Sequence, residues 1–217
     1  MDSLDKYKKA WDKQPEEANK VSKADIYKMS RSKSSSIVKW IFIIGILELL
    51  FWAGLNLSFV GSSYTELYET LHIEAFIYSS VYLHYFVITV FLVLFYKNYK
   101  SISISDNTKT LIQKILSTRK VVKYYVYFNL IFAIAINIIF LFLLFSDVDL
   151  LIEYYNTHGI ETPDNKETFI TSLMISLCIA IVIMFLLLWG FYKLIYGRLL
   201  NKLNKNYKEL IKLENAK

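Results

Sequence analysis

Residues 37–60 read IVKWIFIIGILELLFWAGLNLSFV, a run that is almost entirely apolar. A helix needs about 20 predominantly apolar residues to cross the hydrocarbon core of a bilayer. Three further runs of this kind follow, at 75–96, 121–145 and 169–196. The chain holds only two prolines and six glycines, so little interrupts helices of this length. The sequence therefore predicts an all-α polytopic membrane protein whose four transmembrane helices form two hairpins.

Positive and negative charge alternate along the connections between the four runs. Segment 1–36 holds nine Lys and Arg residues, the middle connection 97–120 holds six, and the tail from residue 193 holds seven. The connection 61–74 holds none, and 146–168 holds one against six acidic residues. Lys and Arg beside spans stay in the cytoplasm. We therefore expect a protein of the bacterial inner membrane, with both termini and the middle connection in the cytoplasm.

These patterns divide the chain into five predicted segments. They are a cytoplasmic N-terminal helical segment (1–36), a first hairpin (37–98), a cytoplasmic amphipathic linker (99–120), a second hairpin with an acidic outer loop (121–196) and a cytoplasmic C-terminal helix (197–217). The net charge of +6 comes from span ends, so we expect the lipid bilayer and no nucleic acid as a partner. A homodimer is a further expectation, because four spans offer only a small core, although no GxxxG motif supports it.

Capping signals predict helices at the first two polar regions. Ser22 with Asp25 resembles a capping box, which predicts a helix that runs from residue 24 into the first span. Ser63 with Glu66 is a similar signal. It predicts a helix that starts near residue 64 and continues into the second span.

Further signals predict helices around the second hairpin. Ser105 and Asp106 are the expected caps before the third span. Asp147 followed by Gly159 predicts a short helix with a glycine stop in the acidic loop. Near-heptad spacing in the tail predicts a helix that continues out of the fourth span and leaves a coiled-coil partner open. The residues of this stripe are Tyr196, Leu199, Leu203, Leu210 and Leu213.

Three polar residues inside the spans are candidates for a functional site. Glu48, His84 and Asn137 each lie several turns from the nearest flanking lysine. Polar groups at membrane depth are costly, so each needs a partner. We expect the three to form one interior polar cluster. Its leading interpretation is hydrogen bonding that specifies helix packing, and its alternatives are a proton-linked or ligand-linked role and an enzyme site.

The sequence carries no recognisable catalytic or metal-binding constellation. The three histidines are His72, His84 and His158, and no two are four residues apart, so helical zinc motifs are missing. Ser172 and Ser176 have no evident base beside them. We therefore expect no catalytic residues, no metal and no cofactor.

The N-terminal segment carries a short amphipathic pattern. Leu4, Tyr7 and Trp11 fall on one face of a helix that Pro15 ends. One interpretation is a helix that rests on the membrane surface or on the bundle. The other is a docking peptide for a cytosolic protein partner.

Three stretches resemble a known family. They are YKKAWDKQ at 7–14, ADIYKM at 24–29 and KSSSIVKWIF at 33–42. They are similar to a family of small four-span membrane proteins of unknown activity from Flavobacteria and other Bacteroidota, closely over the first third of the chain and by topology over the rest. Members often carry a label of beta-carotene monooxygenase type, which implies an enzyme acting on a lipid or isoprenoid. Carotenoid-cleaving enzymes bind iron through several histidines, whereas the spans of this chain hold one.

The pattern of Lys8, Trp11 and Gln14 is also similar to the start of some membrane anti-sigma factors. That similarity implies a sigma factor as the cytosolic partner, although anti-sigma factors have one span and a large periplasmic sensor. The leading hypothesis is a non-enzymatic regulatory or accessory protein that docks a partner through Leu4, Tyr7 and Trp11. The alternatives are a small proton-coupled transport module that uses Glu48 and His84, and the lipid or isoprenoid enzyme.

Overall fold

The fold consists of helices joined by short connections. The structure, a computed structural model, describes residues 22–105, 107–160 and 165–215. The long helices are α2 (Lys23–Phe59), α4 (Glu74–Ser103), α5 (Thr108–Leu144) and α7 (Lys166–Asn215), and the short ones are α3 (Ser63–Thr70) and α6 (Val148–Thr157). These three stretches contain no strand, and each long helix is apolar enough to cross a membrane. The predicted all-α fold with four spans in two hairpins is confirmed.

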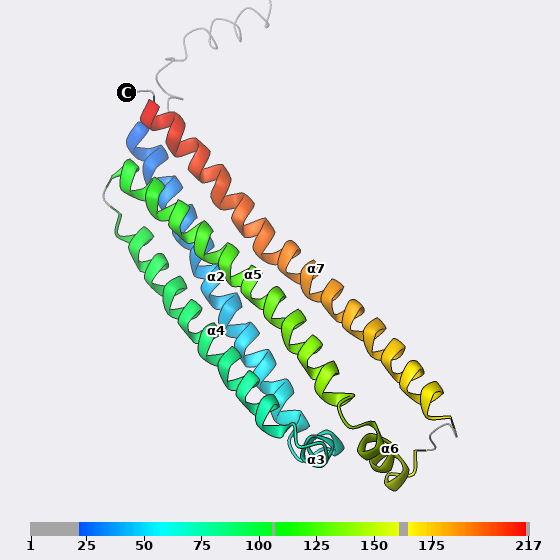
Figure 1. The fold of residues 1–217 in the computed structure, drawn as a ribbon. Coiled ribbons are helices and arrows are strands. Elements are labelled where there is room, and N and C mark those ends of the chain that lie inside the picture. Colours follow the sequence, from blue (N-terminus) through cyan, green and yellow to red (C-terminus); the bar gives the residue numbers. More distant parts are fainter. Residues whose placement is uncertain (1–21, 106, 161–164, 216–217) are drawn as a thin grey trace, which may run out of the picture.

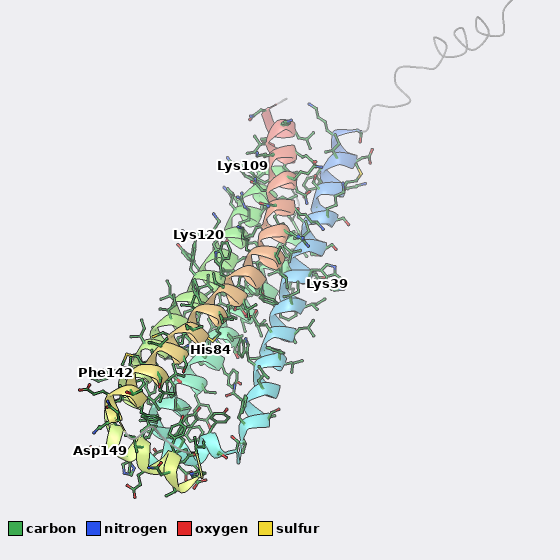
Figure 2. The ribbon with its side chains drawn as sticks, turned by 90° about the vertical axis from the view of Figure 1, so that its right-hand side faces the viewer. Lys39, His84, Lys109, Lys120, Phe142 and Asp149 are labelled. Atoms are coloured by element: carbon green, nitrogen blue, oxygen red, sulfur yellow. The ribbon has the colours of Figure 1, made fainter. Side chains whose placement is uncertain are left out.

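The four long helices run side by side, up and down in turn (Figure 1). Each packs against the next in the order α2, α4, α5 and α7, and α7 closes the ring against α2. One end, which we call the basic end, holds the start of α2, the turn from α4 to α5 and the end of α7 (Figure 1). The short helices α3 and α6 close the opposite, acidic end. Figure 2 shows Lys109 and Lys120 toward the basic end and Asp149 at the acidic end.

The long helices exceed the thickness of a membrane. At 1.5 Å per residue, the 50 residues of α7 extend about 75 Å, and the 37 residues of α2 and of α5 about 55 Å. A hydrocarbon core is about 30 Å thick. The excess lies in the polar, lysine-rich sequence at the basic end, as the predicted helical extensions require. The predicted segment boundaries after residues 36, 98, 120 and 196 fall inside continuous helices.

Two of the predicted helix starts are confirmed with their caps. Ser22 Oγ accepts a hydrogen bond from the Asp25 amide at 3.1 Å and donates one to the Asp25 carboxylate at 2.7 Å. Asp147 Oδ1 accepts from the Leu150 amide at 3.1 Å and starts α6. Gly159 follows the end of α6 with a φ of 71°, a value that suits glycine and confirms the predicted stop.

The predicted continuation of the 64–71 helix into the second span is wrong. α3 ends at Thr70, and α4 begins separately at Glu74. Between them His72 has a φ of 55°, and the Ile73 amide donates to the Tyr68 carbonyl at 2.9 Å. This break turns α3 away from α4 and lets it bury apolar side chains against α6 at the acidic end.

The predicted cap before the third span is also wrong. Asn107 caps α5, and its Oδ1 accepts from the Thr110 amide at 2.7 Å. Ser105 is buried, and its carbonyl accepts hydrogen bonds from the Tyr27 hydroxyl at 2.6 Å and from Arg31 at 3.0 Å. Ser105 therefore ties the turn to α2, while Asp106 lies outside the described residues.

Two hydrophobic cores lie at the two ends of the bundle. The basic-end core takes side chains from all four long helices: Val38, Ile41, Ile88, Leu92, Phe95, Ile102, Leu111, Ile115, Val122, Tyr125, Tyr192, Tyr196, Leu203 and Leu210. The acidic-end core comprises Leu67, Leu71, Ile73, Leu144, Leu151, Tyr154 and Phe169. Three residues of the predicted tail stripe, Tyr196, Leu203 and Leu210, are thus covered by the chain's own helices.

Between the two cores the helices expose apolar side chains. In the most apolar stretch of α7 no side chain is buried inside the protein. We call this part of the bundle the apolar layer; it comprises the spans outside both cores. Lipid is the solvent that such a surface requires.

Candidate functional site

The most buried acidic group inside the spans is Glu48, which lies where α2 meets α7. Its exposed fraction is 6%. The Tyr192 hydroxyl donates a hydrogen bond to Glu48 Oε1, and the Tyr196 hydroxyl donates to Oε2 at 3.1 Å. Both carboxyl oxygens therefore have a phenolic donor, which offsets the cost of removing this group from water.

A third tyrosine, Tyr125 on α5, completes the surroundings of Glu48. Its ring meets the Tyr192 ring edge-on at 6.3 Å between centroids and the Tyr196 ring at 5.6 Å. Its hydroxyl is buried and makes no hydrogen bond to a described residue. We call Glu48, Tyr125, Tyr192 and Tyr196 the carboxyl–tyrosine cluster; it joins α2, α5 and α7.

The carboxyl–tyrosine cluster lies near the basic boundary of the apolar layer. Tyr192 directly precedes Lys193, and Tyr125 comes two residues after Lys123. Lysine side chains of this kind extend to the polar boundary while their stems stay in apolar surroundings. On α2 itself the nearest lysine is Lys39, about 13 Å from Glu48 along the helix axis. The α2 sequence alone would therefore place Glu48 deeper in the apolar layer. The neighbouring helices therefore place Glu48 closer to water than the α2 sequence indicates.

His84 has its partner on α5. Asn129 Nδ2 donates to the Tyr125 carbonyl at 2.8 Å, which fixes the orientation of the amide. Asn129 Oδ1 then faces His84 Nε2 at 2.9 Å, so the Nε2–H of His84 donates this bond. The His84 ring also stacks on Phe132, with centroids 4.9 Å apart and planes at 8°. The pair therefore ties α4 to α5, farther toward the acidic end than Glu48.

The predicted single cluster of Glu48, His84 and Asn137 is not what the structure contains. No hydrogen bond joins any two of them in the described ranges. Asn137 Nδ2 donates to the Ala133 carbonyl of its own helix at 2.8 Å. The reason is register: a Cβ on Gly45 would lie 2.7 Å from Leu92, so Glu48 is level with residues near 90 of α4. His84 lies about one and a half turns beyond that level.

A groove between α2 and α7 borders the carboxyl–tyrosine cluster. Its volume is about 630 Å³, and its lining includes Leu47, Trp52, Met184 and Phe191 beside Glu48. Glu48 is the one ionisable residue among the described lining residues. The groove faces the apolar layer, where acyl chains are the natural filling.

The sequence does not predict that the three tyrosines surround Glu48 or that Asn129 binds His84. Tyr192 and Tyr196 are four residues apart and therefore share one face of α7. Tyr196 begins the tail stripe that is buried against the bundle, so the stripe could have placed Tyr192 on the interior face as well. Nothing in the sequence indicates that this face meets Glu48 on α2.

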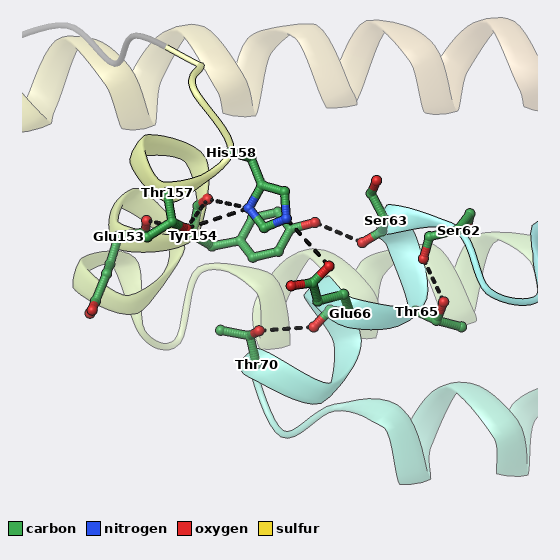
Figure 3. A network of polar contacts seen from close by, with 9 residues as sticks. All are labelled: Ser62, Ser63, Thr65, Glu66, Thr70, Glu153, Tyr154, Thr157 and His158. Atoms are coloured by element: carbon green, nitrogen blue, oxygen red, sulfur yellow. Dashed lines mark hydrogen bonds and ion pairs between the residues drawn. The ribbon is translucent and has the colours of Figure 1, made fainter.

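A second polar network lies at the acidic end, between α3 and α6 (Figure 3). The Tyr154 hydroxyl donates to the Ser63 carbonyl at 2.7 Å. His158 Nδ1 lies 2.8 Å from the Tyr154 carbonyl, and His158 Nε2 lies 3.3 Å from Glu66 Oε2. Both neighbours accept hydrogen bonds, so both ring nitrogens favour carrying a proton. The Tyr154 carbonyl first, and the Glu66 carboxylate second, raise the pKa of His158 above its ordinary value.

The predicted docking residues and a possible metal site are the remaining features to place in the structure. Leu4, Tyr7 and Trp11 lie outside the described residues. Within the part of the chain that the structure describes, no three His, Cys, Asp or Glu side chains lie close enough together to hold a metal ion. What the geometry offers is a buried carboxyl with two phenol donors and a separate histidine–asparagine pair.

Comparison with known proteins gives one match. The family model described as Domain of unknown function (DUF8845) matches residues 24–215. The chain belongs to this family. The DUF8845 match runs from α2 to α7 and includes both the carboxyl–tyrosine cluster and the His84–Asn129 pair. Searches of curated proteins and of solved structures found no match.

Proposed function

We propose that the chain is a non-enzymatic regulatory or accessory protein of the bacterial inner membrane that docks a cytosolic protein. The basic end would face the cytoplasm, because Lys and Arg are retained on that side. In this orientation both termini and the turn from α4 to α5 lie in the cytoplasm. The acidic end, with α3 and α6, faces outward.

The observation that supports a docking role is the packed helical extension at the basic end. Leu111 and Ile115 of α5 and Leu203 and Leu210 of α7 are fully buried there. Asn206 Nδ2 on α7 also donates to Ser34 Oγ on α2 at 3.0 Å, in a buried position. A core of this kind in water makes a rigid base, and binding surfaces work best on rigid elements.

The docking element itself is assigned from the sequence. Leu4, Tyr7 and Trp11 precede α2 and would hold the apolar face of a partner helix or groove. Trp is the residue type most enriched among side chains that dominate binding energy. A sigma factor is the partner class that the resemblance implies.

The test compares full-length proteins in native membranes. Native protein, Trp11→Ala and Trp40→Ala are cross-linked in cells, and captured proteins are quantified by mass spectrometry. Trp40 is a matched control, because it is a tryptophan with an exposed fraction of 56% on α2. We expect one cytosolic protein to be lost with Trp11→Ala and kept with Trp40→Ala. A captured sigma factor would also identify the partner class.

A binding measurement with the captured protein then decides the proposal. Loss of an aromatic anchor typically costs about 2 kcal/mol or more of binding free energy, which raises the dissociation constant roughly 30-fold. The same recovery with native protein and both variants would contradict a docking role for the N-terminal segment.

Proton-coupled transport is the second candidate, and the buried carboxyl of Glu48 favours it, since ionisable groups in spans mark ion or proton routes. Glu48→Gln would then abolish flux in proteoliposomes while the fold stays intact. A lower melting temperature alone would assign Glu48 to packing. The lipid or isoprenoid enzyme stays a prediction, which metal retention by the purified protein would test. The homodimer also stays a prediction, which the mass of the purified particle would test.

A further inference from the structure

A polar groove at the basic end is lined by side chains of α2 and α4. Its volume is about 410 Å³. Three of its lining residues are cationic: Lys28, Arg31 and Lys39. The others carry hydroxyl groups: Ser32, Ser35, Ser36, Tyr99 and Ser103. We call this feature the basic groove.

The basic groove lies along the contact between α2 and α4. Toward the apolar layer, Gly45 allows close contact with Leu92. Toward the basic end, Tyr27 and Arg31 bind the Ser105 carbonyl. Between these two contacts α2 carries the serine-rich sequence SKSSS at 32–36, of which Ser32, Ser35 and Ser36 line the groove.

No described acidic side chain neutralises the charge in the basic groove. No acidic residue is among its described lining residues. Among the described residues, Lys28, Arg31 and Lys39 take no part in a salt bridge; His158–Glu66 and Lys166–Asp149 both lie at the acidic end. Arg31 uses one of its five N–H groups on Ser105, and the others are free to bind an anion.

The position of the basic groove fits a membrane headgroup. Lys39 and Tyr99 form its part nearest the apolar layer, and Figure 2 labels Lys39 on α2. Trp40 and Tyr96 are exposed beside them. Trp and Tyr of this kind lie at headgroup level. Basic pockets between spans at that level bind anionic headgroups, since cations and hydroxyl donors suit phosphate oxygens.

We propose that the basic groove binds the phosphate group of an anionic phospholipid. The phosphate lies between Lys39 and Arg31, with hydroxyl groups of α2 and α4 as further donors. The acyl chains continue past Trp40 into the bilayer. This assignment is independent of the docking role proposed for the N-terminal segment.

The test measures lipid binding to full-length protein by native mass spectrometry during titration with phosphatidylglycerol. The variant is Lys28→Gln/Lys39→Gln, since both side chains are exposed and make no hydrogen bond to a described residue. The control is Lys109→Gln/Lys120→Gln, which removes two exposed lysines from α5 at the same end. Circular dichroism and gel filtration check that all three proteins are folded.

We expect the groove variant to bind phosphatidylglycerol roughly 30-fold more weakly than native protein, on the order of fivefold for each lysine near an anionic surface. The control should differ from native protein by about twofold or less, and added salt should remove the difference. Equal weakening in both variants would overturn the groove as the site.

A second arm separates a lipid headgroup from a free anion. Melting temperatures are measured with inorganic phosphate, and again in nanodiscs of phosphatidylcholine with and without phosphatidylglycerol. Stabilisation by phosphatidylglycerol, absent from the groove variant, supports the proposal. Stabilisation by inorganic phosphate alone, with none from phosphatidylglycerol, would overturn the lipid assignment.

Discussion

The basic end and the apolar layer of this bundle are held together in different ways. At the basic end, all four helices contribute fully buried side chains to one core. In the apolar layer, most side chains face outward, and α7 buries none of its most apolar stretch. Polar contacts take over there: His84 with Asn129, and Asn56 Nδ2, which donates to the Tyr85 hydroxyl at 2.8 Å. At the basic boundary of this layer, Glu48 binds two tyrosines of the basic-end core.

The difference follows from the solvent around each region. The part of the basic-end core beyond the spans, with Leu111 and Leu203, lies in water, where burial of apolar surface drives helices together. In lipid that driving force is missing, because acyl chains are as apolar as leucine, so interhelical hydrogen bonds and close packing hold the spans. The same leucine should therefore matter at the basic end and hardly matter in the apolar layer.

A pair of leucine substitutions tests this contrast with the largest expected effect. Leu203 has an exposed fraction of 0% in the basic-end core, whereas Leu187 is 70% exposed in the apolar layer. Leu203→Ala should lower the free energy of unfolding by about 2–5 kcal/mol, because it leaves a cavity. Leu187→Ala should change it by about 0.5 kcal/mol or less. Both are measured by unfolding in the same lipid; equal losses would remove the contrast.

The carboxyl–tyrosine cluster should show the next largest effect. Glu48→Ala leaves the hydroxyls of Tyr192 and Tyr196 without an acceptor, which should cost about 1–3 kcal/mol. Glu48→Gln keeps an acceptor oxygen and should cost less. Unfolding measurements on both variants check this order. A fully tolerated Glu48→Ala would show that the cluster does not hold α7 to α2.

The His84–Asn129 pair should be weaker. A double-mutant cycle with His84→Ala and Asn129→Ala should give a coupling energy of about 0.6 kcal/mol, with an upper limit near 1.7 kcal/mol. The cycle of His84→Ala with Asn137→Ala is the control and should give no coupling, since Asn137 binds its own helix. Coupling of similar size in both cycles would restore a single polar cluster in the apolar layer.

The smallest effect belongs to the exposed network at the acidic end. The pKa of His158 is raised by the Tyr154 carbonyl and by Glu66. A raised histidine pKa stabilises the folded state below the ordinary value of about 6.5, and this contribution is lost as pH rises through the folded-state pKa. Glu66→Gln should therefore lower the pKa of His158 in an NMR titration. Glu69→Gln, on the same helix, should leave it unchanged; an equal effect of both would point to general charge instead of contact.

Sequence and structure agree where a single helix carries the information. Span lengths, the Ser22 cap, the Gly159 stop and the continuous tail helix depend on residues close together in the chain, so the sequence predicts them. The sequence does not predict the break between α3 and α4 at His72 or the cap at Asn107. Burial of α3 against α6 and the hydrogen bond from Tyr27 to Ser105 cause these features, and both join residues that are far apart in the chain. These contacts outweigh local capping signals.

The candidate site shows the same limit more sharply. Glu48 and His84 were identified as buried polar residues because charge and imidazole are rare in spans. Their partners depend on the offset between neighbouring helices. Gly45 against Leu92 fixes that offset for α2 and α4, and a contact of this kind has no signature in a single sequence. Each candidate therefore has its own partners, and the predicted common cluster does not form.

Four spans with the proposed cytoplasmic basic end make a direct prediction about which side of the membrane each end of the bundle faces. Single cysteines in a Cys178→Ala background, labelled with a membrane-impermeant maleimide in intact and in permeabilised cells, test this orientation. Lys33→Cys, Lys109→Cys and Lys212→Cys should react only after permeabilisation, whereas Glu69→Cys and Glu153→Cys should react in intact cells. Labelling of Lys33→Cys and Lys212→Cys from opposite sides, or of the two acidic-end positions only from inside, would contradict it.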